Sequence, residues 1–284
     1  DHRDLHRLIR RQRQMCIRDS YWAGAEYRHG REARSEFGEP LAPLRADRRT
    51  MGNTLYNAKF RLHDRPVPFK APPWAYRWDS PADFEPAAAR VYRSRGERPA
   101  HFDDLTKGRG RKPNRPTAVA RVWWVEFGGM YDTIRDAEWI RDELFRISLG
   151  LWDYAKNRDP RLSKANTNRE LIWLGYIAGK RESRRLIGDY ILSQQDYIRR
   201  TVHADTVAYG GWGIDLHHPW GLFSPGPQFL IAHRWKVSIP YRCLYSRNIG
   251  NLMMAGRDIS VTHVALRGVR VMRTTCLMGQ AAGT

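Results

Sequence analysis

The last part of the chain constrains the fold most, because it joins an apolar segment, a glycine turn and a helix rich in small residues. Residues 251–256 predict a strand that ends at Gly256, and residues 269–283 predict a helix. A glycine lets the backbone approach a ligand closely, and the first turn of a helix offers N–H groups to negative charge. Small side chains would let this helix lie near its neighbours; they belong to Gly279, Ala281, Ala282 and Gly283.

This stretch, residues 251–284, closely resembles the C-terminal FAD-binding segment of the FAD-dependent oxidoreductases with the glutathione-reductase-like fold. Further motifs carry the resemblance through the rest of the chain in the same order, so it covers nearly everything after residue 20. They are Gly24–Gly38, Trp124–Gly129, Glu182–Leu192, Gly210–His217 and Ile239–Tyr245. Several long motifs in order make a far more specific signal than any one of them.

The resemblance implies an α/β protein, α+β in the part present here, in which a partial Rossmann-like FAD/NAD(P)-binding domain carries an inserted substrate domain. We expect residues 21–65 to be a remnant of the FAD-binding domain and residues 66–235 to form the substrate or cap domain. Residues 236–284 would be a truncated C-terminal FAD-binding segment. A cofactor domain built from both ends of the chain follows from these assignments.

The sequence lacks the strand–GxGxxG–helix unit that holds the pyrophosphate in such flavoproteins. Gly108-Arg-Gly110 is followed by Arg-Lys-Pro, which is typical of a loop. Residues 1–20 include a segment, 11–20, that resembles translated adapter read-through from environmental (metagenomic) assemblies, so we exclude this tail from fold reasoning. We therefore expect the chain to be a fragment of a flavoprotein.

The expected function is FAD-dependent oxidation or reduction, with hydride or electron transfer between FAD and a small organic substrate. The electron acceptor is left open. Two alternatives from other classes remain: a basic nucleic-acid-binding module, and an inactive truncated flavoprotein that has lost much of its FAD site.

By resemblance, residues 255–258 form the turn that meets the ribityl-pyrophosphate part of FAD. Gly256 gives clearance, and Arg257 pairs either with a phosphate or flavin oxygen or with a local carboxylate. Asp258 accepts a hydrogen bond from a ribityl hydroxyl or caps the loop. The helix that follows would contact the cofactor through Arg270, Gly279 and Gln280. Arg267 stands where relatives have glycine, which puts the local turn and the flavin fit in doubt.

Three residues are candidates for proton transfer or substrate orientation: His217, Asp215 and His263. Alternation along a strand places Asp215 and His217 on one side, as a proton-transfer pair requires. The alternative is that both are buried polar residues bonded to the backbone. His218 would point to the other face and be structural.

Metal and cysteine chemistry are disfavoured. The spacing of His217, His218, His233 and His263 matches no ligand signature. Three cysteines, Cys16, Cys243 and Cys276, are too few for the iron–sulfur cluster found in some relatives, which needs about four thiolates. We expect Cys243 and Cys276 to be small buried hydrophobic residues. The polar residues Glu26, Arg31 and Glu36 do not share a helical stripe, which weakens a joint catalytic role for them.

The formal charge is +19, with 49 Lys and Arg against 30 Asp and Glu. The arginines are scattered through every segment and many lie beside acids, which favours a solvated basic surface over a nucleic-acid interface. No apolar run is long enough to span a bilayer and no leader is visible, so a cytoplasmic location is the default expectation.

Local patterns predict the remaining elements. We expect helices near residues 21–37, 169–178 and 195–202, and a longer helix that begins at 132–136 with Thr133 as N-cap. Its buried face would carry Ile140, Leu144, Ile147 and Leu151. Strands are expected at 118–127, 207–216 and 236–244, and extended surface segments at 66–116.

Overall fold

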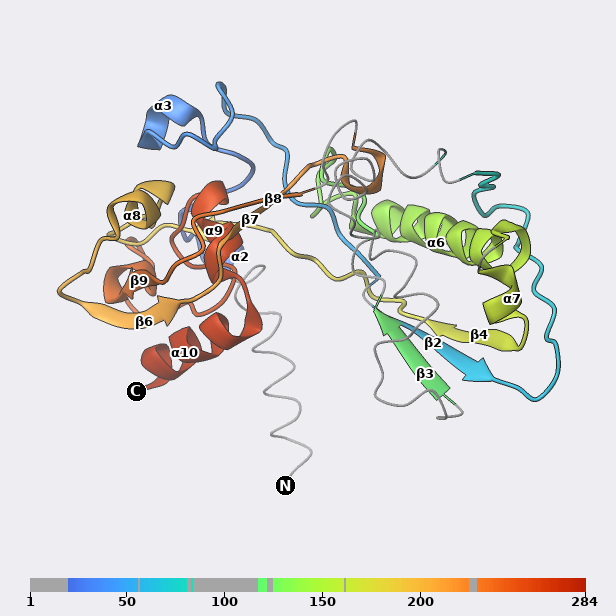
Figure 1. Ribbon diagram of the computed structural model, residues 1–284. Coiled ribbons are helices and arrows are strands. Elements are labelled where there is room, and N and C mark those ends of the chain that lie inside the picture. Colours follow the sequence, from blue (N-terminus) through green and yellow to red (C-terminus); the bar gives the residue numbers. More distant parts are fainter. Residues whose placement is uncertain are drawn as a thin grey trace. The chain divides into compact units, whose positions relative to one another are not determined.

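The structure is a computed structural model that describes residues 20–55, 57–80, 83, 117–121, 125–160, 162–224 and 229–284. Contacts within the chain divide it into two compact units (Figure 1). Unit 1 contains residues up to 50, residues 182–216 and residues 229–284; unit 2 contains residues 51–181 and 217–228. The predicted boundaries at 65/66 and 235/236 fall inside these units. Which unit holds a cofactor and which a substrate stays a prediction.

Unit 1 combines short strands with helices near the end of the chain. Its first elements are α2 (Ser20–Trp22), β1 (Tyr27–Arg28) and α3 (Arg34–Phe37). They are followed by β5 (Arg185–Leu186), α8 (Gln194–Arg199), β6 (Thr206–Gly210), β7 (Ile214–His217, whose last residue is counted with unit 2), β8 (Phe229–Ala232), β9 (Val237–Pro240) and the 3₁₀ turn η5 (Tyr241–Cys243). The last helices are α9 (His263–Val269) and α10 (Met272–Gly283).

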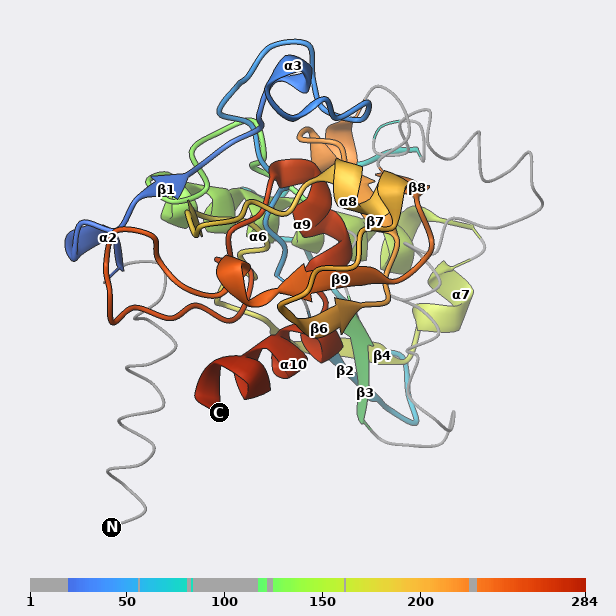
Figure 2. The ribbon, with the colours of Figure 1, turned by 90° about the vertical axis from the view of Figure 1, so that its left-hand side faces the viewer.

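The sheets of unit 1 are small two-stranded pairs. β1 pairs with β5 and β6 with β9, both antiparallel, and β7 pairs with β8. α10 lies beside β6 in both ribbon views (Figures 1 and 2). The core beneath consists of fully buried aliphatic side chains, among them Ile214, Ile239, Val264 and Leu266. Burial of these side chains fixes the position of α9, which is buried along its whole length.

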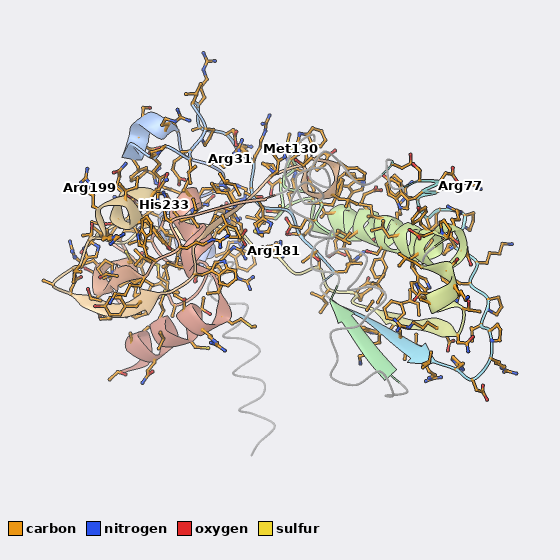
Figure 3. The ribbon with its side chains drawn as sticks, viewed as in Figure 1. Arg31, Arg77, Met130, Arg181, Arg199 and His233 are labelled. Carbon is orange, nitrogen blue, oxygen red and sulfur yellow. The ribbon has the colours of Figure 1, made fainter. Side chains whose placement is uncertain are left out.

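Unit 2 packs a long helix against a three-stranded antiparallel sheet. The sheet order is β3 (Thr117–Arg121), β2 (Asn57–Leu62) and β4 (Arg169–Leu174). α6 (Ala137–Asp153) buries the predicted face, with Ile140, Leu144 and Ile147 at 0% exposure and Leu151 at 4%. The remaining elements are the π-helical turn η3 (Tyr154–Arg158), α7 (Ser163–Asn166) and the 3₁₀ turn η4 (Gly221–Phe223). Figure 3 labels Arg77, Met130 and Arg181 in this unit and Arg31, Arg199 and His233 in unit 1.

The mixed helix and strand content agrees with the predicted α+β character. The Rossmann-like arrangement and the inserted domain stay predictions. Within the described ranges, no helix combines the length and the apolar character needed to cross a membrane.

Two predicted helices are wrong. Residues 21–37 form only α2, β1 and α3, because Gly24 and Gly30 adopt positive φ values of 81° and 88° that end any continuous helix. Residues 169–174 form β4, in which Leu171 is paired with Phe60 of β2. The Leu-Ile-Trp-Leu run suits either element by its pattern, and pairing with β2 decides in favour of a strand.

Other predicted boundaries were also wrong. α6 begins at Ala137, because residues 132–136 form a separate turn in which Asp132 Oδ1 accepts from the N–H groups of Ile134 and Arg135. Thr133 is therefore not the N-cap. Residues 251–256 contain only an isolated bridge between Met253 and Tyr245 and do not form a strand.

The remaining strand and helix predictions hold in part. Residues 207–216 divide into β6 and β7, and residues 236–244 into β9 and η5. The predicted helix 195–202 is α8, and the predicted helix 269–283 is α10 with α9 as a separate helix before it. The predicted strand 118–127 overlaps β3, but residues 122–124 lie outside the described residues. Most of the predicted extended segment 66–116 also lies outside them. Its first part, residues 66–80, is described and forms neither helix nor strand. The tail 1–19 lies outside the described residues as well.

Candidate functional site

The predicted cofactor turn lies in unit 1 between the bridge at Met253 and α9. Arg257 is exposed, whereas Asp258 is 4% exposed. A Cβ added to Gly256 would meet only Oδ1 of Asp258, at 3.0 Å. The backbone carbonyl of Asp258 accepts a hydrogen bond of 2.8 Å from the N–H of Leu186, which ties the turn to β5. The backbone of Asp258 is therefore anchored to β5, whereas the side chain of Arg257 lies at the surface.

The starts of α9 and α10 differ in what occupies their N–H groups. In α9, Oε2 of Glu32 accepts from the N–H of His263 at 2.8 Å, and Oγ1 of Thr262 accepts from the N–H of Ala265. Protein acceptors thus already occupy this helix start. α10 begins after Val271, which offers no side-chain cap, and its first turn carries no acidic residue. The 12-residue helix α10 is therefore the better of the two for an external negative group.

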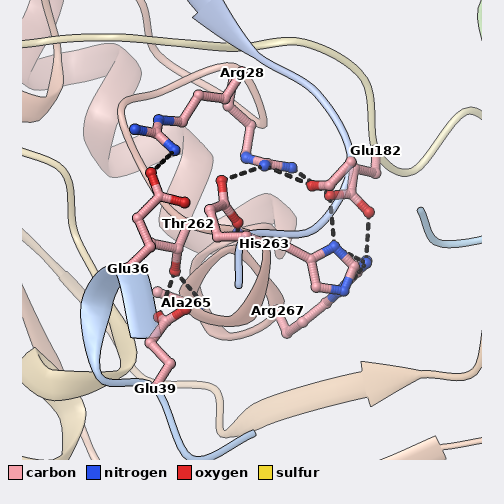
Figure 4. A network of polar contacts seen from close by, with 11 residues as sticks. Arg28, Glu36, Glu39, Glu182, Thr262, His263, Ala265 and Arg267 are labelled. Carbon is pink, nitrogen blue, oxygen red and sulfur yellow. Dashed lines mark hydrogen bonds and ion pairs between the residues drawn. The ribbon is translucent and has the colours of Figure 1, made fainter. Parts of the chain in front are cut away.

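A buried ionic network lies around α9 (Figure 4). Its centre is Glu182, whose side chain is completely buried. Oε1 of Glu182 lies 2.5 Å from Nη1 of Arg185 and 2.9 Å from Nδ1 of His263, and Oε2 lies 2.5 Å from Nη2 of Arg267. Nη2 of Arg185 also contacts Oε1 of Glu32 at 2.8 Å. Two carboxylates thus balance two guanidinium groups inside the unit.

Burial and charge set the protonation of this network. Burial disfavours the imidazolium and the nearby Arg267 cation repels it, which lowers the pKa of His263 to about 4. Burial opposes the charge of Glu182, but Arg267, His263 and Arg185 outweigh it and hold the pKa of Glu182 well below its usual value. Near neutral pH, His263 is therefore neutral and donates its Nδ1 proton to the ionised Glu182.

Arg267 does not disturb a turn, contrary to the expectation from the sequence. It lies inside α9 with 0% exposure, and its charge is matched by Glu182. The position in α9 that requires glycine is the next one, Gly268, where an added Cβ would lie 2.0 Å from Oη of the buried Tyr197.

Asp215 and His217 are both buried in β7 but have different charged partners. Oδ2 of Asp215 accepts from Nη2 of Arg270 at 3.1 Å in unit 1. Nδ1 of His217 lies 2.8 Å from Oε1 of Glu126 in unit 2. The structure thus brings Asp215 together with another predicted residue, Arg270, and gives His217 a carboxylate partner that the sequence did not indicate.

Glu126 is the centre of a second buried ionic group. Its side chain has 0% exposure and also forms an ion pair with Arg181. The N–H of Leu222 donates to the backbone carbonyl of Glu126 at 2.9 Å. Gly221 adopts a φ of 53°, and a Cβ there would lie 2.2 Å from the same carbonyl oxygen. The close approach of η4 therefore fixes the backbone that carries this carboxylate.

Sequence reasoning missed Glu126, Glu182 and Arg185 as members of these networks. The available signal was their place inside motifs that had been singled out for the resemblance, at 124–129 and 182–192. The glutamate and arginine of those motifs would have suggested buried ion pairs, because charged residues in otherwise apolar surroundings need partners.

The remaining predicted residues have separate environments. Gly279 and Gln280 are exposed on α10, about two turns from its start. His218 Nδ1 accepts from the N–H of Trp220 at 3.3 Å. Cys243 is buried as predicted, whereas Cys276 is exposed, so the prediction for Cys276 was wrong. Among the described residues, no group of three or more His, Cys, Asp or Glu side chains is placed to hold a metal ion.

The polar residues of the 24–38 motif each have their own partner. Arg31 pairs with Asp47, Glu36 with Arg28 and Glu26 with Arg247.

In a comparison with protein families, the model described as FAD dependent oxidoreductase matches residues 20–284. Searches of curated proteins and of solved structures gave no match. The match spans both units, including the predicted cofactor turn, the Glu182 network and the Glu126 group. The chain belongs to the FAD-dependent oxidoreductase family.

Proposed function

We propose that the protein catalyses an FAD-dependent redox reaction in which a hydride or an electron pair passes between FAD and a small organic substrate. The observation that carries this proposal is the family match over residues 20–284. Bound FAD would supply the two-electron chemistry that protein side chains lack. A Rossmann-like cofactor domain in unit 1 and a substrate domain in unit 2 form part of the proposal, as does a separate electron acceptor of unknown class.

The donor set at the end of unit 1 suits an anionic, oxygen-rich cofactor. The first turn of α10 lacks a side-chain cap, so its N–H groups favour negative charge on a ligand. Arg270 precedes this helix and is held by Asp215. Arg257 is exposed beside Gly256. Apart from its chain neighbours, the only described atom within 4 Å of a Cβ added to Gly256 is Oδ1 of Asp258. These residues would hold the phosphates and ring oxygens of FAD, and the exposed Gly279 and Gln280 would contact a more distant part.

Proton handling is assigned to the Glu126 group. The 2.8 Å contact between Nδ1 of His217 and Oε1 of Glu126 would orient the His217 ring, as a side chain that exchanges a proton with substrate requires. Arg181 balances the charge of Glu126. We assign Asp215 to holding Arg270, and His263 to positioning α9, because the imidazole of His263 stays neutral near pH 7 and both of its nitrogens already face Glu182 and Arg267.

Replacement of Arg257 by Ala tests the cofactor assignment. Loss of one charge-assisted contact to phosphate costs about 1.5–3 kcal/mol, which corresponds to a roughly 10- to 150-fold increase in the Kd for FAD. Isothermal titration of the apoprotein with FAD measures this change. The matched control is Arg247→Ala, which removes another exposed arginine paired with Glu26 and should leave the affinity for FAD unchanged. Equal affinities of the two variants would show that Arg257 does not contact the cofactor.

A further inference from the structure

One buried carboxyl group in unit 1 takes no part in the ionic networks described above. Glu39 has 0% exposure, although it lies in the loop that follows α3. Its Oε1 accepts a 2.6 Å hydrogen bond from the N–H of Gln194 and another of 2.6 Å from Oγ1 of Thr262. Its Oε2 is buried and has no hydrogen-bond partner among the described residues. No arginine or lysine forms an ion pair with Glu39 in the described part of the chain.

These contacts join three segments that are distant in sequence. Gln194 is the first residue of α8, and Thr262 is the N-cap of α9. The loop is tied to α8 a second time, because Oε1 of Gln194 accepts from the N–H of Leu41 at 3.0 Å. The Thr262 hydroxyl donates to Glu39 and also accepts from the N–H of Ala265, as Figure 4 shows. A change in the charge of Glu39 therefore acts on the loop, α8 and α9 together.

We propose that Glu39 is a proton-operated switch: its neutral carboxyl group holds residues 38–42, the start of α8 and the N-cap of α9 together, and its ionisation loosens all three. The geometry carries this proposal, since an ionised carboxylate in this place would be buried with one oxygen unpartnered and no paired cation among the described residues. Removal of a charge from water without a partner is strongly unfavourable.

The electrostatics place the switch near neutral pH. Burial raises the pKa of Glu39 from its ordinary value of 4.5 to about 7, although hydrogen bonds from Thr262 and Gln194 oppose the shift. The charged groups that face it are Glu32, which raises the pKa further, and Arg185, which lowers it. The folded protein then binds more protons than the opened form between pH 4.5 and about 7. The closed arrangement is therefore most favoured below this range and is weakened as the pH rises through it.

Two neighbouring histidines need to be distinguished from Glu39. His263 has a pKa of about 4 and stays neutral across the window. His233 contacts Gln194, with its Nε2 2.9 Å from Nε2 of Gln194. His233 has a φ of 49°, a conformation that asparagine tolerates well. The substitution His233→Asn therefore removes the imidazole without straining the backbone.

Hydrogen exchange of the full chain tests the switch. The opening equilibrium of the amides at 38–42, 193–196 and 262–265, corrected for intrinsic exchange rates, is measured between about pH 5.5 and 8.5. With a pKa of about 7 closed and 4.5 open, linkage predicts that opening increases roughly 30-fold over this range. Glu39→Gln, which keeps the shape and removes the titration, should make opening independent of pH, while His233→Asn should keep the wild-type response.

The proposal is wrong if opening of the wild-type segments does not change with pH, or if Glu39→Gln retains the full response. It is also wrong if His233→Asn abolishes the response. If Glu39→Gln fails to fold, the wild type and His233→Asn still test the proposal. A roughly 30-fold increase of opening with pH in both proteins supports Glu39 as the titrating group.

Discussion

At the scale of single residues, unit 1 depends on Glu182 as the common counter-charge of two buried guanidinium groups. Arg185 is 1% exposed and Arg267 is 0% exposed, and both contact this carboxylate at 2.5 Å. A buried ion pair is weakly stabilising compared with apolar residues, but loss of one partner leaves an uncompensated charge in a medium of low polarity. Loss of the Glu182 charge should therefore destabilise unit 1.

Replacement of Glu182 by Gln should lower the free energy of unfolding by about 3–5 kcal/mol, because Arg185 and Arg267 lose their shared anion. Urea unfolding near pH 7 measures the change. Glu138→Gln serves as control, since Glu138 has an 82% exposed side chain and pairs with Arg141 on the surface. That variant should change stability by less than about 1 kcal/mol. Equal stabilities of the two variants would contradict the assigned role of Glu182.

His217 and Asp215 were chosen from a single motif, and their role in proton transfer stays a prediction. The resemblance singled out His217 and Asp215, and both are buried beside charged partners. The identity of those partners was not predictable, because Glu126 and Arg270 are 91 and 55 residues away from them along the chain. A single sequence contains no signal that joins residues so far apart unless a pairing pattern is known beforehand.

At the scale of secondary-structure elements, two glycines in the last two helices have opposite surroundings. Gly268 in α9 has Tyr197 Oη in the space that a Cβ needs, whereas Gly279 in α10 has nothing within 4 Å. Helix propensity alone would favour alanine over glycine at both positions by about 1 kcal/mol. Packing should reverse this preference at Gly268, because an added Cβ would lie 2.0 Å from Oη and 2.7 Å from Cζ of the buried Tyr197.

We therefore expect Gly268→Ala to destabilise the protein by about 1–3 kcal/mol and Gly279→Ala to be neutral or to stabilise it by up to about 1 kcal/mol. Thermal unfolding of the two variants beside the wild type gives the comparison. If Gly268→Ala is as stable as Gly279→Ala, Tyr197 moves aside at no cost in stability. The packing of α8 against α9 would then not require glycine at position 268.

Elements with a strong periodic pattern were predicted well, and elements set by distant pairing were not. The apolar face of α6 was read correctly from Ile140, Leu144, Ile147 and Leu151, since a 3.6-residue period is a local property. β4 was read as a helix because only its pairing with β2, more than 100 residues earlier in the chain, distinguishes the two forms. The start of α6 was misplaced because Asp132 builds its own turn before the helix.

At the scale of the whole molecule, the chain passes between the two units after residues 50, 181, 216 and 228. Such interleaving means that both ends of the described chain contribute to unit 1, as a cofactor domain built from both ends would require. The sequence did not indicate that residues 182–216 belong to unit 1, because those residues are joined to it by contacts with distant segments such as β1 and α9.

The central claim, that this family member works through bound FAD, is tested most directly by measuring whether the purified full chain binds the flavin and reduces it. Titration of the chain with FAD, followed by anaerobic addition of a panel of small organic reductants, is monitored by flavin absorbance. The account predicts saturable binding of one FAD per chain and bleaching of the flavin by at least one compound, with weaker binding in the Arg257→Ala variant. Absence of FAD binding under these conditions would contradict it.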